Sequence, residues 1–187
     1  MIVVTAPTGN IGRQVLSHLL EAGASVRVIV RAASKLPEPV RKRVEVIEGS
    51  HGDAGTVERA FAGVDTLFWL VPPNPKVRTV DEAYVDFTRP AAAALQRHGV
   101  KRVVDITALG RGTPWADRAG FVASSFRMDD LIASTGVAFR AVTNPSFMDN
   151  IARQAVPIRE KGLFFLPFDG DKKMPAAATR DIAAICR

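Results

Sequence analysis

The chain has 187 residues, the length of one domain, and 47% of them are hydrophobic, which suffices for a substantial core. Its apolar runs are broken by charges, Pro or Gly, so none could span a bilayer, and the strand-like first residues leave no room for a signal peptide. One cysteine excludes an internal disulfide, and three scattered histidines form no metal-binding pattern. We therefore expect a soluble cytoplasmic protein without a membrane partner.

The formal net charge of +6 favours anionic partners such as nucleotides and phosphates. The most basic stretch, Arg41-Lys42-Arg43, lies just before a predicted strand and has no aromatic residues among its cations. This pattern is more typical of a solvated helix end than of a nucleic-acid site, so we expect no nucleic-acid partner.

The N-terminal residues carry the clearest functional pattern. Residues 2–5 form a β-branched apolar run, a glycine-containing turn follows, and residues 13–22 read as an amphipathic helix. This is the context of a dinucleotide fingerprint, in which backbone N–H groups and the helix dipole face the pyrophosphate. We expect a side chain at Gly9 to collide with phosphate, and Gly12 to let the helix pack closely on the first strand. Because Ala6 replaces the first glycine of the G-x-x-G-x-x-G pattern, we expect it to have ordinary dihedrals. The alternative is a turn that uses its glycines only for packing.

Strand-like and helical segments alternate along the rest of the chain. Three predicted helices end at a glycine that is soon followed by a strand, namely Gly23, Gly99 and Gly136. Such alternation predicts an α/β fold, a Rossmann-type doubly wound sheet, mainly parallel and six-stranded. The expected strands are residues 2–5, 26–30, 44–47, 65–71, 102–106 and 138–143.

Arg31 ends the second predicted strand, 22 residues after Gly9. NAD-preferring sites usually have Asp or Glu near this place, where it binds the ribose hydroxyls. Here a guanidinium, with Lys35 close behind, could hold a 2′-phosphate. We therefore expect NADP(H) to be favoured over NAD(H). A surface arginine that only ends a strand is the alternative.

Four other segments give local expectations. Asp53 should cap a helix over residues 54–62, while His51 before it could contact adenine or have no role. Pro90 should kink or break a long helix over residues 78–98. Residues 162–168 are strongly apolar; we expect core, with a substrate wall or a subunit contact as alternatives. Residues 179–187 resemble the middle of a helix.

The whole chain resembles the NmrA-like atypical short-chain dehydrogenase/reductases, and most closely the bacterial NAD(P)H:quinone oxidoreductase branch. The stretches Val4–Gly12 and Phe147–Asn150 are fairly specific for that group, whereas Val30-Arg31, Gly52-Asp53 and Arg180–Ala183 are common among Rossmann relatives. The family usually continues well beyond the last stretch. The resemblance therefore implies a Rossmann domain over residues 1–143 and a reduced, partial substrate lobe over residues 144–187.

The resemblance also implies roles for individual residues. Thr8, Gly9, Asn10 and Ile11 would hold the pyrophosphate, Arg31 the 2′-phosphate, and Phe147 would flank the substrate together with Asn150. Cofactor contacts are further expected at Lys35, Ser50, Leu70, Val71, Pro72, Thr107, Ala108, Asn144 and Pro145. Two of these depart from the family, which commonly has an acidic residue at Ser50 and an arginine at Asn144.

The catalytic chemistry is less defined. Tyr84 is the one tyrosine and Thr88 stands four residues on, so the Tyr-x-x-x-Lys pair of alcohol-oxidising relatives is not present in the sequence. The first reading is a reductase that passes hydride from NADPH to a quinone-like acceptor, with the catalytic residue unknown. The second is a non-catalytic module that senses NADP(H). A sugar epimerase or dehydratase is a weaker third reading, since those reactions need the tyrosine. A homodimer stays open.

Overall fold

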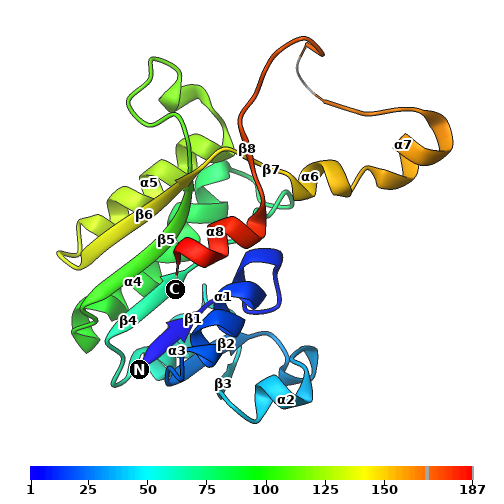
Figure 1. The fold of residues 1–187 in the computed structure, drawn as a ribbon. Coiled ribbons are helices and arrows are strands. Elements are labelled where there is room, and N and C mark those ends of the chain that lie inside the picture. Colours follow the sequence, from blue (N-terminus) through cyan, green and yellow to red (C-terminus); the bar gives the residue numbers. More distant parts are fainter. Residues whose placement is uncertain (167–168, 187) are drawn as a thin grey trace.

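A computed structural model describes residues 1–166 and 169–186. Its centre is a six-stranded sheet in the order β3-β2-β1-β4-β5-β6, and every neighbouring pair is parallel (Figure 1). This order, with helices on both faces, is the doubly wound Rossmann-type fold expected from the alternating pattern. The strands are β1 (Ile2–Val4), β2 (Val26–Val30), β3 (Glu45–Glu48), β4 (Thr66–Trp69), β5 (Arg102–Ala108) and β6 (Ala138–Asn144).

Two hydrophobic clusters lie on the two faces of this sheet. One contains apolar side chains of α3 (Ala54–Phe61), α4 (Phe87–His98) and α5 (Phe121–Ala133). The other contains those of α1 (Asn10–Glu21) and α8 (Thr179–Ile185). Because both faces are covered, the central strands are apolar on both sides, which explains their short runs of Val, Ile, Leu and Phe.

Hydrogen bonds join the carboxyl ends of β1 and β4. The Thr5 N–H donates to the Phe68 carbonyl at 3.1 Å, and the Thr5 hydroxyl oxygen accepts from the Leu70 N–H at 2.7 Å. Thr5 is fully buried, so these bonds fix the two loops that follow the strands relative to each other. The loops leave the sheet side by side at the edge where parallel α/β folds bind ligands.

Most helix signals in the sequence are confirmed. The Asp53 carboxylate accepts a hydrogen bond from the Thr56 N–H at 2.8 Å and so caps α3. Gly23, Gly99 and Gly136 have φ angles of 73°, 62° and 82°, as expected for glycines that end helices. Helix α1 begins at Asn10, three residues earlier than the apolar pattern indicated.

The segment around Pro90 is irregular, as expected. A π-helical turn, η2 (Glu82–Asp86), precedes α4, and Pro90 lies inside α4. Proline has no N–H for the carbonyl four residues earlier, which belongs to Asp86. The irregular turn therefore ends at the residue whose carbonyl cannot be used by Pro90. Two short 3₁₀ turns and one short helix complete the part of the chain before β6: η1 (Ala33–Lys35), α2 (Glu38–Arg41) and η3 (Ala116–Arg118).

Beyond β6 the chain forms an arm that projects from the sheet (Figure 1). It contains β7 (Ser146–Phe147), α6 (Asp149–Ala152) and α7 (Ala155–Lys161), and the chain returns through β8 (Ala176–Ala177), which pairs with β7. It then enters α8, which lies beside α1. None of the described helices is long and apolar enough to cross a bilayer.

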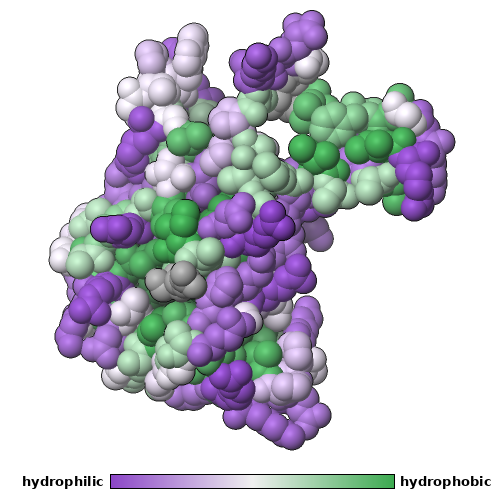
Figure 2. All heavy atoms as spheres, viewed as in Figure 1, coloured by the Kyte–Doolittle hydropathy of each residue, from purple (hydrophilic) through white to green (hydrophobic). Residues whose placement is uncertain are grey.

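The expectation that residues 162–168 form core is wrong for its described part. Leu163, Phe164, Phe165 and Leu166 are between 43% and 65% exposed; residues 167 and 168 lie outside the described residues. The Gln154 side chain binds the backbone N–H and carbonyl of Phe165, both at 2.8 Å. The segment is thereby held on the arm, away from both clusters, and Figure 2 shows hydrophobic side chains gathered on the arm's surface.

Candidate functional site

Two cavities lie at the carboxyl edge of the sheet, on either side of the β1–α1 turn. The β2 cavity measures 630 Å³ and is lined from the ends of β1, β2, β3 and β4. The β5 cavity measures 560 Å³ and is lined from β1, β4, β5 and β6. Both include Ala6, Gly9, Pro72 and Pro73, so they adjoin at the turn. Together they form one groove across the point where the strand order reverses.

The β1–α1 turn is tighter than the sequence indicated. Ala6 has φ +47°, and it is the one non-glycine residue with positive φ among those the structure describes. The expectation of ordinary dihedrals at Ala6 is therefore wrong. The Ala6 carbonyl accepts from the Gly9 N–H at 3.0 Å, which closes a β-turn with Pro7 and Thr8 as its central residues.

The two glycines of the turn have different surroundings. A Cβ at Gly12 would lie 2.2 Å from the Ala6 carbonyl oxygen, so a side chain there is excluded by the protein itself. A Cβ at Gly9 would lie at an ordinary 3.4 Å from the same oxygen. The close approach at Gly12 is to the turn that follows β1, not to the strand itself. Gly9 is thus free of any such constraint from the described chain.

The N-terminus of α1 opens into this groove without a side-chain cap. Its N-cap residue is Gly9, which has no side chain to cap the helix, and the first turn holds no acidic residue. The N–H groups of Asn10, Ile11 and Gly12 precede the first intrahelical bond, which Arg13 makes to Gly9. Unpaired N–H groups and the positive end of the helix dipole together form an anion site.

The β2 cavity is lined by both cationic and aromatic side chains. Arg31 and Lys35 line it, and within residues 1–166 and 169–186 neither side chain makes a hydrogen bond or an ion pair. His51 lies edge-on to the rings of Trp69 and Phe87, at centroid distances of 5.1 and 4.8 Å. Burial lowers the pKa of His51 to about 4, so its imidazole is neutral at pH 7.

The β5 cavity is mainly apolar, with a few polar groups. The loop after β4 contributes the backbone of Leu70 to Pro73, and β5 contributes Ile106, Thr107 and Ala108. Asn144 is 7% exposed and its amide donates to the Val142 carbonyl at 2.6 Å, which fixes the end of β6. Pro145 and Phe147 follow it on the wall of the cavity.

All but one of the residues expected from the sequence line this groove. The β2 cavity contains Thr8, Arg31, Lys35 and Ser50, and the β5 cavity contains Asn10, Ile11, Leu70, Val71, Thr107, Ala108, Asn144, Pro145 and Phe147, while Gly9 and Pro72 line both. The exception is Asn150, which is exposed on α6 and lines neither cavity. Its contact with a substrate stays a prediction.

Five further polar residues line the β5 cavity that sequence reasoning did not propose as site residues: Tyr84, Ser125, Asp149, Arg153 and Thr179. Tyr84 comes from η2, before β5, and only the tertiary fold brings it to the cavity. Burial, and then the charge of Asp105, raise the pKa of Tyr84, so its phenol stays protonated at neutral pH. Asp149 accepts from the Asn10 amide at 3.3 Å and from the Thr179 hydroxyl at 3.0 Å, which joins α6 and α8 to the start of α1.

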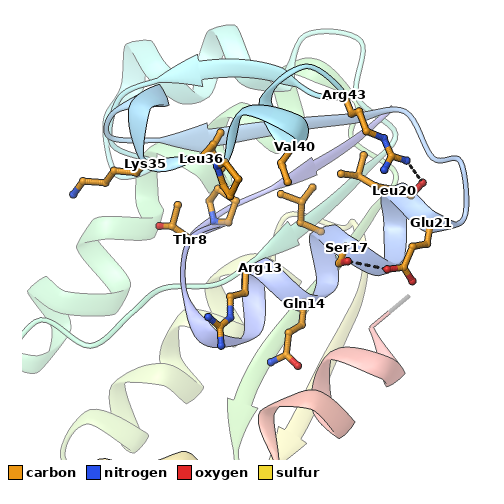
Figure 3. Close-up of a pocket in the computed structure, with 13 residues that line it drawn as sticks. Thr8, Arg13, Gln14, Ser17, Leu20, Glu21, Lys35, Leu36, Val40 and Arg43 are labelled. Atoms are coloured by element: carbon orange, nitrogen blue, oxygen red, sulfur yellow. Dashed lines mark hydrogen bonds between the residues drawn. The ribbon is translucent and has the colours of Figure 1, made fainter.

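A third cavity, of 480 Å³, lies on the other side of α1 (Figure 3). Leu36 and Val40 face α1 across it, and the Arg43 guanidinium donates to the Leu20 carbonyl at 2.6 Å. It shares Pro7, Thr8 and Lys35 with the β2 cavity. Lys35 therefore stands between the two, beside the uncapped start of α1.

Behind the β5 cavity lies a pair of buried acids. Asp105 of β5 is fully buried and Asp129 of α5 is 2% exposed. The Thr107 hydroxyl, which lines the cavity, donates to Asp129 Oδ2 at 2.8 Å. Arg111 donates to the same oxygen at 3.0 Å and to Asp130 at 2.8 Å. Burial, and then the neighbouring charge of Asp129, raise the pKa of Asp105 well above its usual range.

Comparison with known proteins shows which class of ligand the family of this chain binds. Residues 7–184 match the model of a family described as NAD(P)H-binding. The chain belongs to the NAD(P)H-binding family. This confirms NAD(P)H binding as the family property that the β1–α1 turn indicated in the sequence.

Two curated relatives from bacteria extend over nearly the whole chain. A (4-alkanoyl-5-oxo-2,5-dihydrofuran-3-yl)methyl phosphate reductase of Streptomyces griseus is 33% identical over 187 residues, and an NAD(P)H azoreductase of Xenophilus azovorans is 30% identical over 185. Each match covers 99% of this chain and 61% of the relative. The chain thus spans about three fifths of the length of these relatives.

Solved structures share the fold. An NADPH-dependent quinone oxidoreductase of Escherichia coli, solved with NADPH, superposes with a TM-score of 0.81 at 23% identity over all of this chain and 63% of that one. A nucleoside-diphosphate-sugar epimerase of Staphylococcus aureus gives the same TM-score at 18% identity, over 97% of this chain and 63% of that one. At these identities the likeness shows the Rossmann-type fold, which both kinds of enzyme use.

Proposed function

We propose that this protein is an NADPH-dependent reductase of a quinone-like acceptor. The observation that carries the proposal is the continuous groove at the strand-order reversal, with the uncapped start of α1 at its middle. An anion at that helix end and two flanking cavities suit a dinucleotide with a nucleoside on either side. The NAD(P)H azoreductase among the relatives supports a redox role, because azo groups and quinones both accept a hydride and a proton.

The proposed placement follows the groove from β2 to β6. The pyrophosphate binds the N–H groups at Thr8 to Ile11, and the adenosine lies in the β2 cavity beside Ser50. The nicotinamide side occupies the β5 cavity, against Leu70, Val71, Pro72, Thr107, Ala108, Asn144 and Pro145. The acceptor then stacks near Phe147, in the apolar part of that cavity, with residues 144–187 as the partial substrate lobe.

The preference for NADP(H) rests on two cations. Arg31 and Lys35 both line the β2 cavity, and within the described chain neither is neutralised by an ion pair. A guanidinium can bind a 2′-phosphate with two parallel hydrogen bonds, which a ribose hydroxyl cannot match.

The proposed chemistry needs orientation more than a strong acid. Bound NADPH would supply the hydride. The chain's one tyrosine, Tyr84, lines the cavity, but its raised pKa makes its phenol a weaker proton donor than an ordinary tyrosine. The protein would contribute the alignment of cofactor and acceptor on the wall formed by Pro145 and Phe147, and the exclusion of bulk water.

A non-catalytic NADP(H) sensor is the second candidate. The observation that favours it is that Tyr84, which lines the cavity, is followed four residues on by Thr88 and not by a lysine that would activate its phenol for proton transfer. In this case the groove would bind the cofactor without consuming it.

One experiment separates the two functions. The purified protein is incubated with NADPH and a panel of simple quinones, and cofactor oxidation is followed beside NADH and a Gly9→Asp control. Turnover that needs the quinone and is lost in Gly9→Asp supports the reductase. Tight NADPH binding without turnover by any acceptor supports the sensor, and no binding at all contradicts both.

Replacing Arg31 by alanine tests the cofactor preference. We expect Arg31→Ala to weaken NADPH binding about tenfold or more, the loss of one charge-assisted hydrogen-bonded contact, and to leave NADH binding nearly unchanged. Arg41→Ala is the matched control, since it removes an exposed arginine of α2 that lines neither cavity of the groove. Titration of each variant by cofactor fluorescence gives both constants. An equal loss for the two cofactors would mean that Arg31 does not select the phosphate.

A further inference from the structure

The buried acids Asp105 and Asp129 have no role in the chemistry described so far. Side chains two residues apart on a strand point to the same face, so Asp105 and Thr107 both face α5, where Asp129 lies. Asp105, Thr107 and Asp129 are 0%, 7% and 2% exposed. Burying two carboxyl groups side by side is costly unless their oxygens are satisfied, so this arrangement requires a physical explanation.

Each carboxyl group has one satisfied and one unsatisfied oxygen. Asp105 Oδ1 accepts from the Ile106 N–H at 2.6 Å, and Asp129 Oδ2 accepts from Thr107 and Arg111. Within the described part of the chain, Asp105 Oδ2 and Asp129 Oδ1 are buried and have no donor. A single proton held between these two oxygens satisfies both at once and halves the buried negative charge. The remaining charge is balanced by the Arg111 guanidinium.

This shared proton is connected to the β5 cavity. The shared proton can settle on Asp129, and a half-turn of that carboxyl group about its Cβ–Cγ bond brings the protonated oxygen to the position of Oδ2. Oδ2 lies 2.8 Å from the Thr107 hydroxyl, which lines the cavity. A hydroxyl can accept a proton from one side and donate its own to the other. The three side chains therefore form a hydrogen-bonded path from a protein-held proton to the cavity.

We propose that Asp105, Asp129 and Thr107 form a proton relay that delivers the proton required when the acceptor is reduced; this rests on the proposed reductase function. Thr107 is the catalytic residue of the relay, since it faces the acceptor, and Asp105 and Asp129 act through it. The relay supplies the acid that the Tyr-x-x-x-Lys pair provides in related enzymes.

The step balances in atoms and charge. The cofactor's hydride passes to the acceptor with two electrons, so the acceptor is reduced and NADPH becomes NADP⁺. The Thr107 hydroxyl turns and gives its proton to the acceptor oxygen that gains negative charge. Thr107 takes in exchange the shared proton, which has settled on Asp129 and which the turned carboxyl group presents to the Thr107 oxygen, so the pair becomes two carboxylates beside Arg111. A proton from solvent then restores the pair, and a quinone acceptor leaves as the hydroquinone.

The charged and titratable groups around the pair come from four elements. Arg111, from the loop after β5, contacts Asp129 and is itself paired with the exposed Asp130 of α5. Tyr84 of η2 and Cys186 after α8 are neutral, and the charge of Asp105 contributes to the rise in both of their pKa values. Arg111 is therefore the cation that compensates the pair when it loses its proton.

Single-turnover kinetics test the relay. Reduction of a quinone is followed at saturating NADPH in H₂O and D₂O, over the pH range in which the protein is folded. We expect Thr107→Val to slow this step by about a hundredfold or more and to abolish its solvent isotope effect. Thr107→Ser keeps a hydroxyl at the same place and should restore both, and Asp129→Asn should behave like Thr107→Val. Asp130→Asn, which alters only the exposed partner of Arg111, is the control with unchanged kinetics.

A second readout does not depend on turnover. A proton held by the pair should give an infrared carbonyl band of a protonated carboxyl group at neutral pH, shifted in D₂O and missing in Asp105→Asn, provided that circular dichroism shows this variant folded. Absence of the band from the wild-type protein overturns the relay. So does a Thr107→Val variant with wild-type rate and isotope effect, which would leave the reductase function intact. A wild-type protein that reduces no quinone contradicts the reductase and the relay together, whether or not the band is present.

Discussion

At the scale of single residues, three small residues of the turn between β1 and α1 have different roles. Ala6 takes a left-handed conformation with φ +47°, which costs a residue with a Cβ more than it costs glycine. Its carbonyl then lies where any side chain at Gly12 would collide with it. Gly9 is under no such constraint, since its φ is −80° and a Cβ there would make only an ordinary contact at 3.4 Å. We therefore expect its lack of a side chain to serve a ligand and not the fold.

Substitutions at the two glycines should separate these roles. We expect Gly12→Ala to lower the free energy of unfolding by about 2–3 kcal/mol, because a backbone oxygen cannot move away from the new methyl group without shifting the turn. Gly9→Ala should leave the melting temperature near the wild-type value and still weaken NADPH binding. Urea unfolding and cofactor titration of both variants provide the measurements. A Gly12→Ala protein as stable as the wild type would show that the turn is adaptable.

His51 should make the protein sensitive to acid. Its folded-state pKa of about 4 lies below its unfolded value of 6.5, so the unfolded state binds the proton more readily. Its contribution is therefore constant above about pH 6.5, and stability is lost as the pH falls from there towards 4, by about 3 kcal/mol at most.

The matched variant is His51→Phe, which keeps an aromatic ring against Trp69 and Phe87. Carboxylates titrate in the same range, so the informative quantity is the difference between wild type and variant in urea unfolding at each pH. We expect that difference to be constant above about pH 6.5 and to shift in favour of the variant as the pH falls towards 4. Parallel curves would show that the imidazole is hydrated in the folded state.

At the scale of elements, one buried hydrogen bond joins a strand to the helix that covers it. The Trp69 indole N–H of β4 donates to the Thr88 hydroxyl of α4 at 3.2 Å, and the two side chains are 0% and 1% exposed. We expect Thr88→Val to lower the free energy of unfolding by about 1–3 kcal/mol, because the indole N–H would stay buried without an acceptor. Thr88→Ser, which keeps the hydroxyl, should lose less. Chemical denaturation of the two variants measures the difference, and equal losses would mean that the hydroxyl contributes no more to stability than the methyl group.

Elements with strong local patterns were predictable, and those shaped by tertiary contacts were not. The six strands agree with the apolar runs to within one or two residues, because buried parallel strands need such runs. The π turn at Glu82–Asp86 has no pattern of its own and follows from Pro90. Residues 163–166 have a core-like composition, yet the arm leaves them exposed. Composition records how apolar a segment is, not which surface covers it.

The candidate site likewise contains residues that could be predicted from local patterns and residues that depend on tertiary contacts. Groove-lining positions such as Gly9 and Pro72 come soon after the ends of strands, so they could be located from the sequence. Tyr84 and Asp149 reach the groove from η2 and α6, and only the packing of those elements brings them there. The acids Asp105 and Asp129 lie on different elements and share no sequence motif. Ala6 was misjudged because a positive φ is usually indicated by glycine, and alanine at this place gives no such sign in the sequence.

At the scale of the whole molecule, the groove draws on residues from both halves of the sheet, so its ligand should stabilise the entire fold. With NADPH at a hundred times its dissociation constant, linkage predicts about 2.7 kcal/mol of added stability, a rise in melting temperature of roughly 5–10 °C for a domain of this size. Differential scanning calorimetry with and without cofactor measures it, and adenosine alone is the control that fills only the β2 cavity. No shift with NADPH would contradict binding in the groove.

Strand β1, near the centre of this sheet, precedes both of its neighbours along the chain. Ile2 is paired with Val26 on one side and with Thr66 on the other, so β1 acquires its second neighbour only after β4 has left the ribosome. At typical elongation rates that wait lasts several seconds. Throughout it, one edge of the most apolar strand is open to other nascent chains. The N-terminal strand should therefore be the segment that a chaperone protects first.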